Sequence, residues 1–198
     1  MGLNGSGKTT LVEIAVGWRR GDRGVVIVDG DRLTSPDLAT LARRGIFYLP
    51  QRSWLSPIQT VRTHFDALSF HIKYAATHET IDRLELEPYL DYRPHELSGG
   101  ERRRVELGLA VARRPTCLIA DEPFLGIAPQ DAEVVAAVFR ELSESGCGVL
   151  VTGHEVTQLL DIADHVIWIS AGTTHDLGSP THAVEHRQFA REYLGPNY

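Results

Sequence analysis

Cysteine is scarce in this 198-residue chain, which contains only Cys117 and Cys147. The two do not form a Cys-x-x-Cys pair, so we expect buried, reduced thiols at both positions. Long apolar runs are missing as well. The longest are far too short to cross a membrane, and no signal peptide is recognisable, which predicts a cytoplasmic location.

Positive charge is also in short supply. The chain carries 20 Lys and Arg against 26 Asp and Glu, a formal net charge of −6. This balance argues against loose binding to nucleic acid or to acidic lipid, so no nucleic-acid partner is expected. We interpret the run Arg102–Arg104 as the solvated face of a helix. The pair His182 and His186 lacks the His-Glu-x-x-His arrangement, so we predict no metal site there.

Glycine is present where an anion would need it. The stretch Gly2-Leu3-Asn4-Gly5-Ser6-Gly7-Lys8-Thr9 matches the phosphate-loop pattern G-x-x-x-x-G-K-[ST] without a gap. Glycines let the backbone N–H groups approach phosphate oxygens closely, and the following helix adds a partial positive charge. Lys8 is expected to reach the β- and γ-phosphates, and the Thr9 hydroxyl to bind Mg²⁺. A chance glycine-rich turn is disfavoured because an apolar helix begins directly afterwards.

Two acids follow an apolar strand. Cys117–Ala120 reads as a strand buried on both faces, and Asp121 and Glu122 stand at its carboxyl end, where open α/β sheets bind ligands. Asp121 suits Mg²⁺, through water, and Glu122 is the candidate general base for an attacking water. A surface turn carrying two acids is the alternative, which the upstream phosphate loop disfavours.

Three further positions gain meaning from their order along the chain. Ser98 caps a helix that opens with Gly99 and Gly100, although an ordinary helix cap would explain this tripeptide by itself. Gln51 follows the apolar strand 46–49, and His154 follows the strand 149–152.

Taken together, the motifs resemble the nucleotide-binding subunit of an ABC transporter along the whole length of the chain. The resemblance implies an α/β P-loop NTPase fold, with a mainly parallel sheet flanked by helices and an inserted helical subdomain at residues 55–97. ATP and Mg²⁺ are the expected cofactors. The implied partners are ATP, a second ABC ATPase subunit in a homo- or heterodimer, and a membrane permease that holds the chain on the inner face of the membrane.

The resemblance also assigns roles to individual residues. Leu97-Ser98-Gly99-Gly100-Glu101 corresponds to the signature segment, which binds the γ-phosphate of ATP held by the opposite subunit. Gln51 corresponds to the Q-loop glutamine, which touches Mg²⁺ or the water and senses the permease, and His154 to the switch histidine at the γ-phosphate. The expected set is, for ATP, Gly2, Asn4, Gly5, Ser6, Gly7, Lys8, Thr9, Thr10, Ser98, Gly99 and Gly100; for Mg²⁺, Thr9, Gln51 and Asp121; for catalysis, Glu122, His154 and Gln51.

The chain departs from the family pattern in places. The strand that normally feeds the phosphate loop is not in the sequence, so residues 1–198 are expected to be a single ABC ATPase domain lacking its N-terminal strands. Ala128 stands where the family usually has the acid of the D-loop, and Glu101 replaces a commoner glutamine. A soluble ABC ATPase without a transport role, or a catalytically impaired partner or fragment, remains as the alternative function. The tail 189–195 is similar to that of subunits for branched-chain amino-acid uptake and lipopolysaccharide export.

The remaining pattern alternates strands and helices, as βαβ units do. The predicted elements are a strand at 25–28 turned by Asp29-Gly30, a helix capped by Ser35-Pro36 and ended by Gly45, a helix from Thr60, a short helix carrying Ile81, Leu84 and Leu86, helices at 102–113, 131–142 and 155–163, and a strand at 166–169.

Overall fold

The computed structural model describes residues 1–193, so Leu194 and Gly195 of the tail lie outside the described residues. The chain divides into two compact units. One consists of residues 37–150, and the other of residues 1–36 together with the chain from residue 151 onward.

A parallel strand pair lies at the centre of the unit 37–150. Strand β3 (Ile46–Leu49) pairs in parallel with β4 (Cys117–Asp121), with Ile46 opposite Cys117 and Leu49 opposite Ala120. The strand order is β3-β4-β5, where β5 (Gly148–Thr152) begins in this unit and ends in the other. Buried positions along β4 confirm the predicted interior strand, but Cys117 at its start is only partly buried, which corrects one expected buried thiol.

The helix before β3 begins later than predicted. Helix α2 (Leu38–Arg43) is capped by Asp37, whose carboxylate accepts the Thr40 N–H at 2.8 Å, and not by Ser35-Pro36. Asp37 has the extended backbone that an N-cap requires, and its side chain supplies the acceptor. Gly45 follows the C-cap with φ of 80°, which confirms it as the stop signal of this helix.

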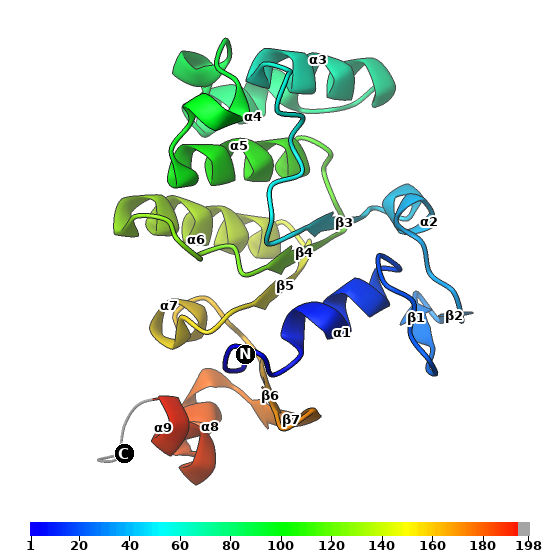
Figure 1. The fold of residues 1–198 in the computed structure, drawn as a ribbon, viewed down its shortest axis with the longest axis vertical. Helices are drawn as coiled ribbons and strands as arrows, with labels where there is room; N and C mark the ends of the chain where they lie inside the picture. Colours follow the sequence, from blue (N-terminus) through cyan, green and yellow to red (C-terminus); the bar gives the residue numbers. More distant parts are fainter. Residues whose placement is uncertain (194–198) are drawn as a thin grey trace. The chain divides into compact units, whose positions relative to one another are not determined.

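The stretch expected to be a helical subdomain does contain helices. They are α3 (Val61–His71), capped by Thr60, α4 (Thr77–Arg83), and two short 3₁₀ helices at Glu87–Tyr89 and Pro94–Glu96. Leu84 and Leu86 were expected inside α4 but follow its end, where Glu85 takes a positive φ, and both are still buried. In Figure 1, α3 and α4 lie on the side of α5 that faces away from α6. That residues 55–97 act as a subdomain stays a prediction.

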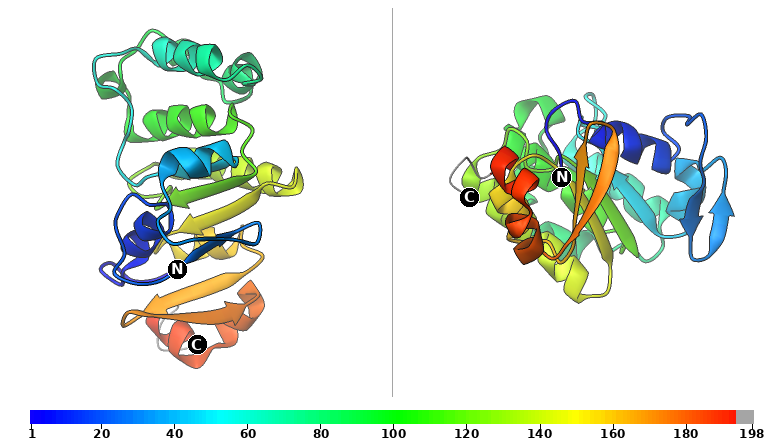
Figure 2. Two further views of the ribbon diagram at one scale, coloured as in Figure 1. Left: turned by 90° about the vertical axis from the view of Figure 1, so that its right-hand side faces the viewer. Right: turned by 90° about the horizontal axis from the view of Figure 1, so that it is seen from below.

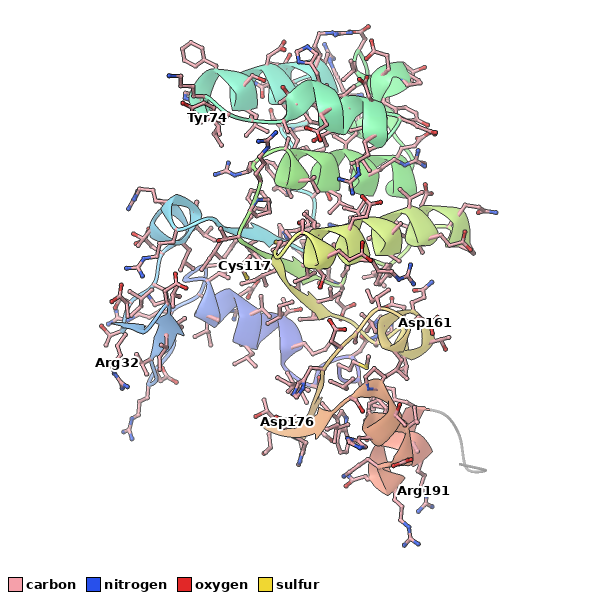
Figure 3. All side chains as sticks on the ribbon, turned by 180° about the vertical axis from the view of Figure 1, so that it is seen from behind. Arg32, Tyr74, Cys117, Asp161, Asp176 and Arg191 are labelled. Carbon is pink, nitrogen blue, oxygen red and sulfur yellow. The ribbon has the colours of Figure 1, made fainter. Side chains whose placement is uncertain are left out.

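Two long helices complete this unit. Helix α5 (Gly99–Val111) ends before the predicted Arg113, and α6 (Pro129–Glu144) is longer than predicted. The buried side of α6 contains Val135, Val138, Phe139 and Leu142, at the spacing of one helix face. Figure 3 shows the side chains along these helices; Tyr74, beyond the end of α3, is 75% exposed.

The other unit begins with α1 (Lys8–Ala15) and a hairpin. Strands β1 (Val26–Val28) and β2 (Asp31–Leu33) pair antiparallel through Asp29 and Gly30, which both have positive φ, as a tight two-residue hairpin turn requires. The turn was predicted, but β2 was not.

The same unit ends in a second hairpin and two helices. Its elements are α7 (Val156–Leu160), shorter than the expected 155–163, β6 (Val166–Ser170), β7 (Thr173–Gly178), α8 (Pro180–Glu185) and α9 (Arg187–Tyr193). Trp168 of β6 and Phe189 of α9 centre a buried cluster, and Figure 2 shows β6 and β7 as a curved ribbon beside α8 and α9. Of β6, β7, α8 and α9, only β6 was predicted. No helix among residues 1–193 is long and apolar enough to cross a membrane.

Candidate functional site

The phosphate-loop motif folds as the sequence predicts, as a turn that leads into a helix. Gly7 is the N-cap of α1 with φ of 99°, and Gly5 has φ of 80°. Both are conformations that glycine adopts without strain. A Cβ added to either residue would meet no atom within 4 Å, so these glycines are needed for backbone conformation and leave open space beside the loop.

Gly2 is needed for a different reason. A Cβ added here would lie 2.5 Å from Ser6 Oγ and 2.7 Å from the carbonyl oxygen of Ile169 in β6. The preceding residue, Met1, accepts a hydrogen bond from the Ile169 N–H at 2.8 Å, so the start of the loop is fixed beside β6. Ser6 Oγ is buried and has no hydrogen-bond partner among the described residues, which leaves this hydroxyl available to an incoming acceptor.

Lys8 is buried at the start of α1. Its Nζ donates to the carbonyl oxygens of Gly2 at 2.7 Å and Leu3 at 3.1 Å, so the ammonium group lies within the curve of the loop. Thr9 is partly buried and Thr10 is exposed one residue further on. A loop of exposed N–H groups around a buried ammonium at a helix N-terminus is the arrangement that binds phosphate.

His154 lies in the same unit as the phosphate loop, two residues after the end of β5. The neighbouring Glu155 accepts a hydrogen bond from the His154 backbone N–H at 3.2 Å, and its other oxygen lies 3.7 Å from His154 Nε2. The carboxylate therefore restrains the backbone of His154 and lies near its ring.

Asp121 is the last residue of β4 in the unit 37–150, and Glu122 follows it. Both side chains are buried. Glu122 has φ of 47°, a left-handed conformation that a non-glycine residue adopts only at a cost in free energy. The next turn is closed by the Leu125 N–H, which donates to Glu122 O at 3.2 Å. This conformation sets the direction in which the Cα–Cβ bond of Glu122 leaves the backbone.

The signature segment opens α5 with reciprocal hydrogen bonds. Ser98 Oγ accepts the Glu101 N–H at 3.2 Å, and the Glu101 carboxylate accepts the Ser98 N–H at 2.8 Å. These bonds lower the pKa of Glu101, with the Ser98 backbone bond as the largest cause. Ser98 was predicted as the cap, but the reciprocal role of Glu101 was not, although Ser-x-x-Glu is a recognisable capping box.

The arginine run on α5 was wrongly assigned to a solvated face. Arg103 is buried: it donates from Nη1 to Pro50 O at 3.0 Å and from Nη2 to Gln51 O at 2.9 Å, and it pairs with Glu106 at 3.0 Å. Burial lowers the pKa of Arg103, against the raising effect of Glu106 and Asp121, and burial raises the pKa of Glu106, against the lowering effect of Arg103.

The signal for this pair was in the sequence. Arg103 falls three to four residues before the buried Glu106 and Leu107, so it lies in register with the inner face of the helix. Charge alone suggested a surface, whereas a guanidinium that meets two carbonyls and a carboxylate can be buried.

The structure thus places the expected residues in two groups. Gln51, Ser98, Gly99, Gly100, Asp121 and Glu122 belong to the unit 37–150, while residues 2–10 and His154 belong to the other. The first group lies at the end of β3, at the end of β4 and at the start of α5. The individual roles assigned to these residues remain predictions.

Comparisons with known proteins identify the family. The model of the ABC transporter family matches residues 1–125. The lipopolysaccharide export system ATP-binding protein LptB of Haemophilus influenzae is 33% identical over 205 aligned positions, which cover 100% of this chain and 85% of that protein. LptB of Escherichia coli K12 is 34% identical with the same coverage, and a probable ABC transporter ATP-binding protein of Azorhizobium caulinodans is 35% identical over 73% of its length.

Solved structures agree in fold. The ADP conformation of an ATP-binding cassette of an ABC transporter has a TM-score of 0.82 at 24% identity, covering 99% of this chain and 86% of that one. A dimeric cassette in a post-hydrolysis state, bound to ADP and Pi, has a TM-score of 0.75 at 25% identity, covering 89% and 83%. The fold is therefore that of a P-loop NTPase. The chain belongs to the ABC transporter family, as an ATP-binding subunit that hydrolyses ATP to drive transport.

Proposed function

We propose that this chain is the ATPase subunit of an exporter of the lipopolysaccharide-export type, held on the inner face of the membrane by a permease. The observation that carries the proposal is the similarity to LptB of two organisms over the full length of the chain. The transported substrate would be an amphiphilic, lipid-linked saccharide, and the active ATPase would be a dimer of ABC subunits.

In this proposal the loop of residues 2–10 binds the ATP phosphates. Gly5 and Gly7 supply backbone N–H groups, Lys8 balances the charge of the β- and γ-phosphates, and the buried Ser6 hydroxyl gains an acceptor. The Lys8 ammonium, bonded to two loop carbonyls, lies in the loop that would hold the phosphates.

The catalytic roles follow from the chemistry of the residues. Glu122 takes a proton from the attacking water, and His154, restrained by Glu155, contacts the γ-phosphate. Gln51 orients the water, with its backbone held by Arg103. The oxygen donors of Thr9, Gln51 and Asp121 fit Mg²⁺, which prefers oxygen ligands, and the ion would neutralise charge on the transferring phosphoryl group.

The test of the catalytic assignment is Glu122→Gln. We expect phosphate release to fall at least 100-fold, a typical size for loss of a general base, while ATP binding is retained. Glu144→Gln, at an exposed position of α6, is the matched control. Phosphate release by Glu122→Gln at the wild-type rate would remove Glu122 as the base. Chelation of Mg²⁺ with EDTA should abolish wild-type turnover, and turnover in its presence would remove the ion from the mechanism.

The test of the transport assignment is reconstitution. The chain and the permease subunits of the same organism should co-purify from detergent and export lipopolysaccharide from proteoliposomes in an ATP-dependent manner. Export supported equally by Glu122→Gln, or transport of branched-chain amino acids by the assembled complex, would overturn the proposal.

A further inference from the structure

The two signature glycines lie against the chain segment that follows Glu122. A Cβ added to Gly99 would be 3.2 Å from the carbonyl oxygen of Gly126. One added to Gly100 would be 1.7 Å from Asp131 Oδ2, a complete overlap. The carboxylate of Asp131 occupies the space where a side chain at position 100 would be. Glycine is therefore required at this position even without a phosphate nearby.

The same carboxylate also binds α5 one turn further along. Asp131 Oδ1 accepts from Arg104 Nη2 at 2.8 Å, and the two side chains are only 18% and 17% exposed. Gly100 and Arg104 are four residues apart and share one helix face. Asp131 in the first turn of α6 thus contacts α5 at both positions, and the ion pair is partly shielded from water.

Ala128, the N-cap of α6, provides no side-chain hydrogen bond at the start of this helix. Asp131 is the acid in the first turn of that helix. A carboxylate without a cation at this position would repel an anion approaching the N-terminus of α5, whereas Arg104 neutralises it. Both the direction of the signature segment and its local charge therefore depend on the pair.

We propose that Asp131 and Arg104 are positioning residues that hold Ser98, Gly99 and Gly100 in the orientation that receives the γ-phosphate of ATP on the partner subunit. The inference rests on the proposed ABC dimer. It predicts a defect in ATP-driven closure of the dimer, and no defect in the first binding of ATP to the phosphate loop of the same subunit.

The test uses Asp131→Asn, which keeps the shape of the side chain and removes its charge. In the Glu122→Gln chain, we expect ATP affinity of the monomer to change less than twofold. The ATP concentration that half-saturates dimer formation, measured by size-exclusion chromatography with light scattering, should rise about tenfold, as expected when binding groups are misplaced by a fraction of an ångström. Asp91→Asn, which breaks the exposed pair with Arg62, is the control and should leave both quantities unchanged.

Turnover supplies the second measurement. Arg104→Gln should lower kcat/KM for ATP about tenfold, and Arg104→Lys, which keeps the charge, should recover a substantial part of kcat/KM. Unchanged dimer formation by Asp131→Asn, or equal kcat/KM for Arg104→Lys and Arg104→Gln, would overturn the inference. Absence of any ATP-dependent dimer in the Glu122→Gln parent would instead overturn the proposed function.

Discussion

Arg103 of the signature helix donates a hydrogen bond from Nη2 to the backbone carbonyl of Gln51, at 2.9 Å. Nη1 of the same guanidinium bonds to Pro50 O and pairs with Glu106, so one buried cation joins α5 to the end of β3. The backbone at Pro50 and Gln51 is therefore linked directly to α5 through this side chain.

Replacement of Arg103 by methionine should lower the free energy of unfolding. It leaves Glu106 buried without its cation and two carbonyls without donors, which costs about 3–5 kcal/mol in comparable buried pairs. The free energy of unfolding from urea titration measures the loss. The double variant Arg103→Met with Glu106→Leu removes both charges and should recover most of this stability.

The double variant separates stability from positioning. It restores a well-packed apolar interior but not the hydrogen bonds to Pro50 and Gln51, so ATP turnover should stay well below that of the wild type. A double variant that is stable and hydrolyses ATP at the wild-type rate would show that the Arg103 hydrogen bonds do not position Gln51.

Stability should carry an acid-sensitive contribution from Glu101. The Ser98 bonds lower the pKa of Glu101 in the folded chain, so this contribution is present above the unfolded pKa, about 4.3 for glutamate, and is lost as pH falls through the folded value. Glu101→Gln keeps the shape of the capping box without the charge. Its deficit in unfolding free energy at pH 7 should shrink as pH falls through the lowered pKa of folded Glu101, and a deficit independent of pH would contradict the assignment.

Ala128→Asp should add the missing cap to α6. An aspartate at an N-cap stabilises a helix by about 0.5–2 kcal/mol relative to alanine, and repulsion from Asp131 in the same turn should place the gain at the lower end. If the position has its family role between the two ATP sites, turnover or its Hill slope should also rise. A stability gain without a kinetic effect would limit the role of Ala128 to helix capping.

The left-handed backbone of Glu122 predicts that asparagine is better tolerated there than glutamine. Asparagine tolerates positive φ better than glutamine, so the free energy of unfolding of Glu122→Asn should exceed that of Glu122→Gln by about 1 kcal/mol. Both variants should lack turnover. Thermal melts of the two variants compare them directly. An equally stable or less stable Glu122→Asn would contradict this prediction.

The sequence alone determined the features that depend on neighbouring residues. The phosphate loop, the strand 117–120 with its two acids, the Ser98 cap and the Gly45 stop all follow from local conformation and from apolar periodicity, and the structure places each as expected. The family follows from the order of these motifs, because their residue types are set by the chemistry of phosphate binding.

Only the tertiary structure decided which charged side chains are interior. Arg103 meets the carbonyls of Pro50 and Gln51, and Asp131 pairs with Arg104 beside Gly100, so each contact joins segments that are distant in sequence, and the burial of each charge depends on what the other segment supplies. Charge alone assigns such a residue to the surface, because isolated charges are expensive to bury. That cost is offset here by carbonyls and carboxylates from other elements, which become neighbours only when the chain folds.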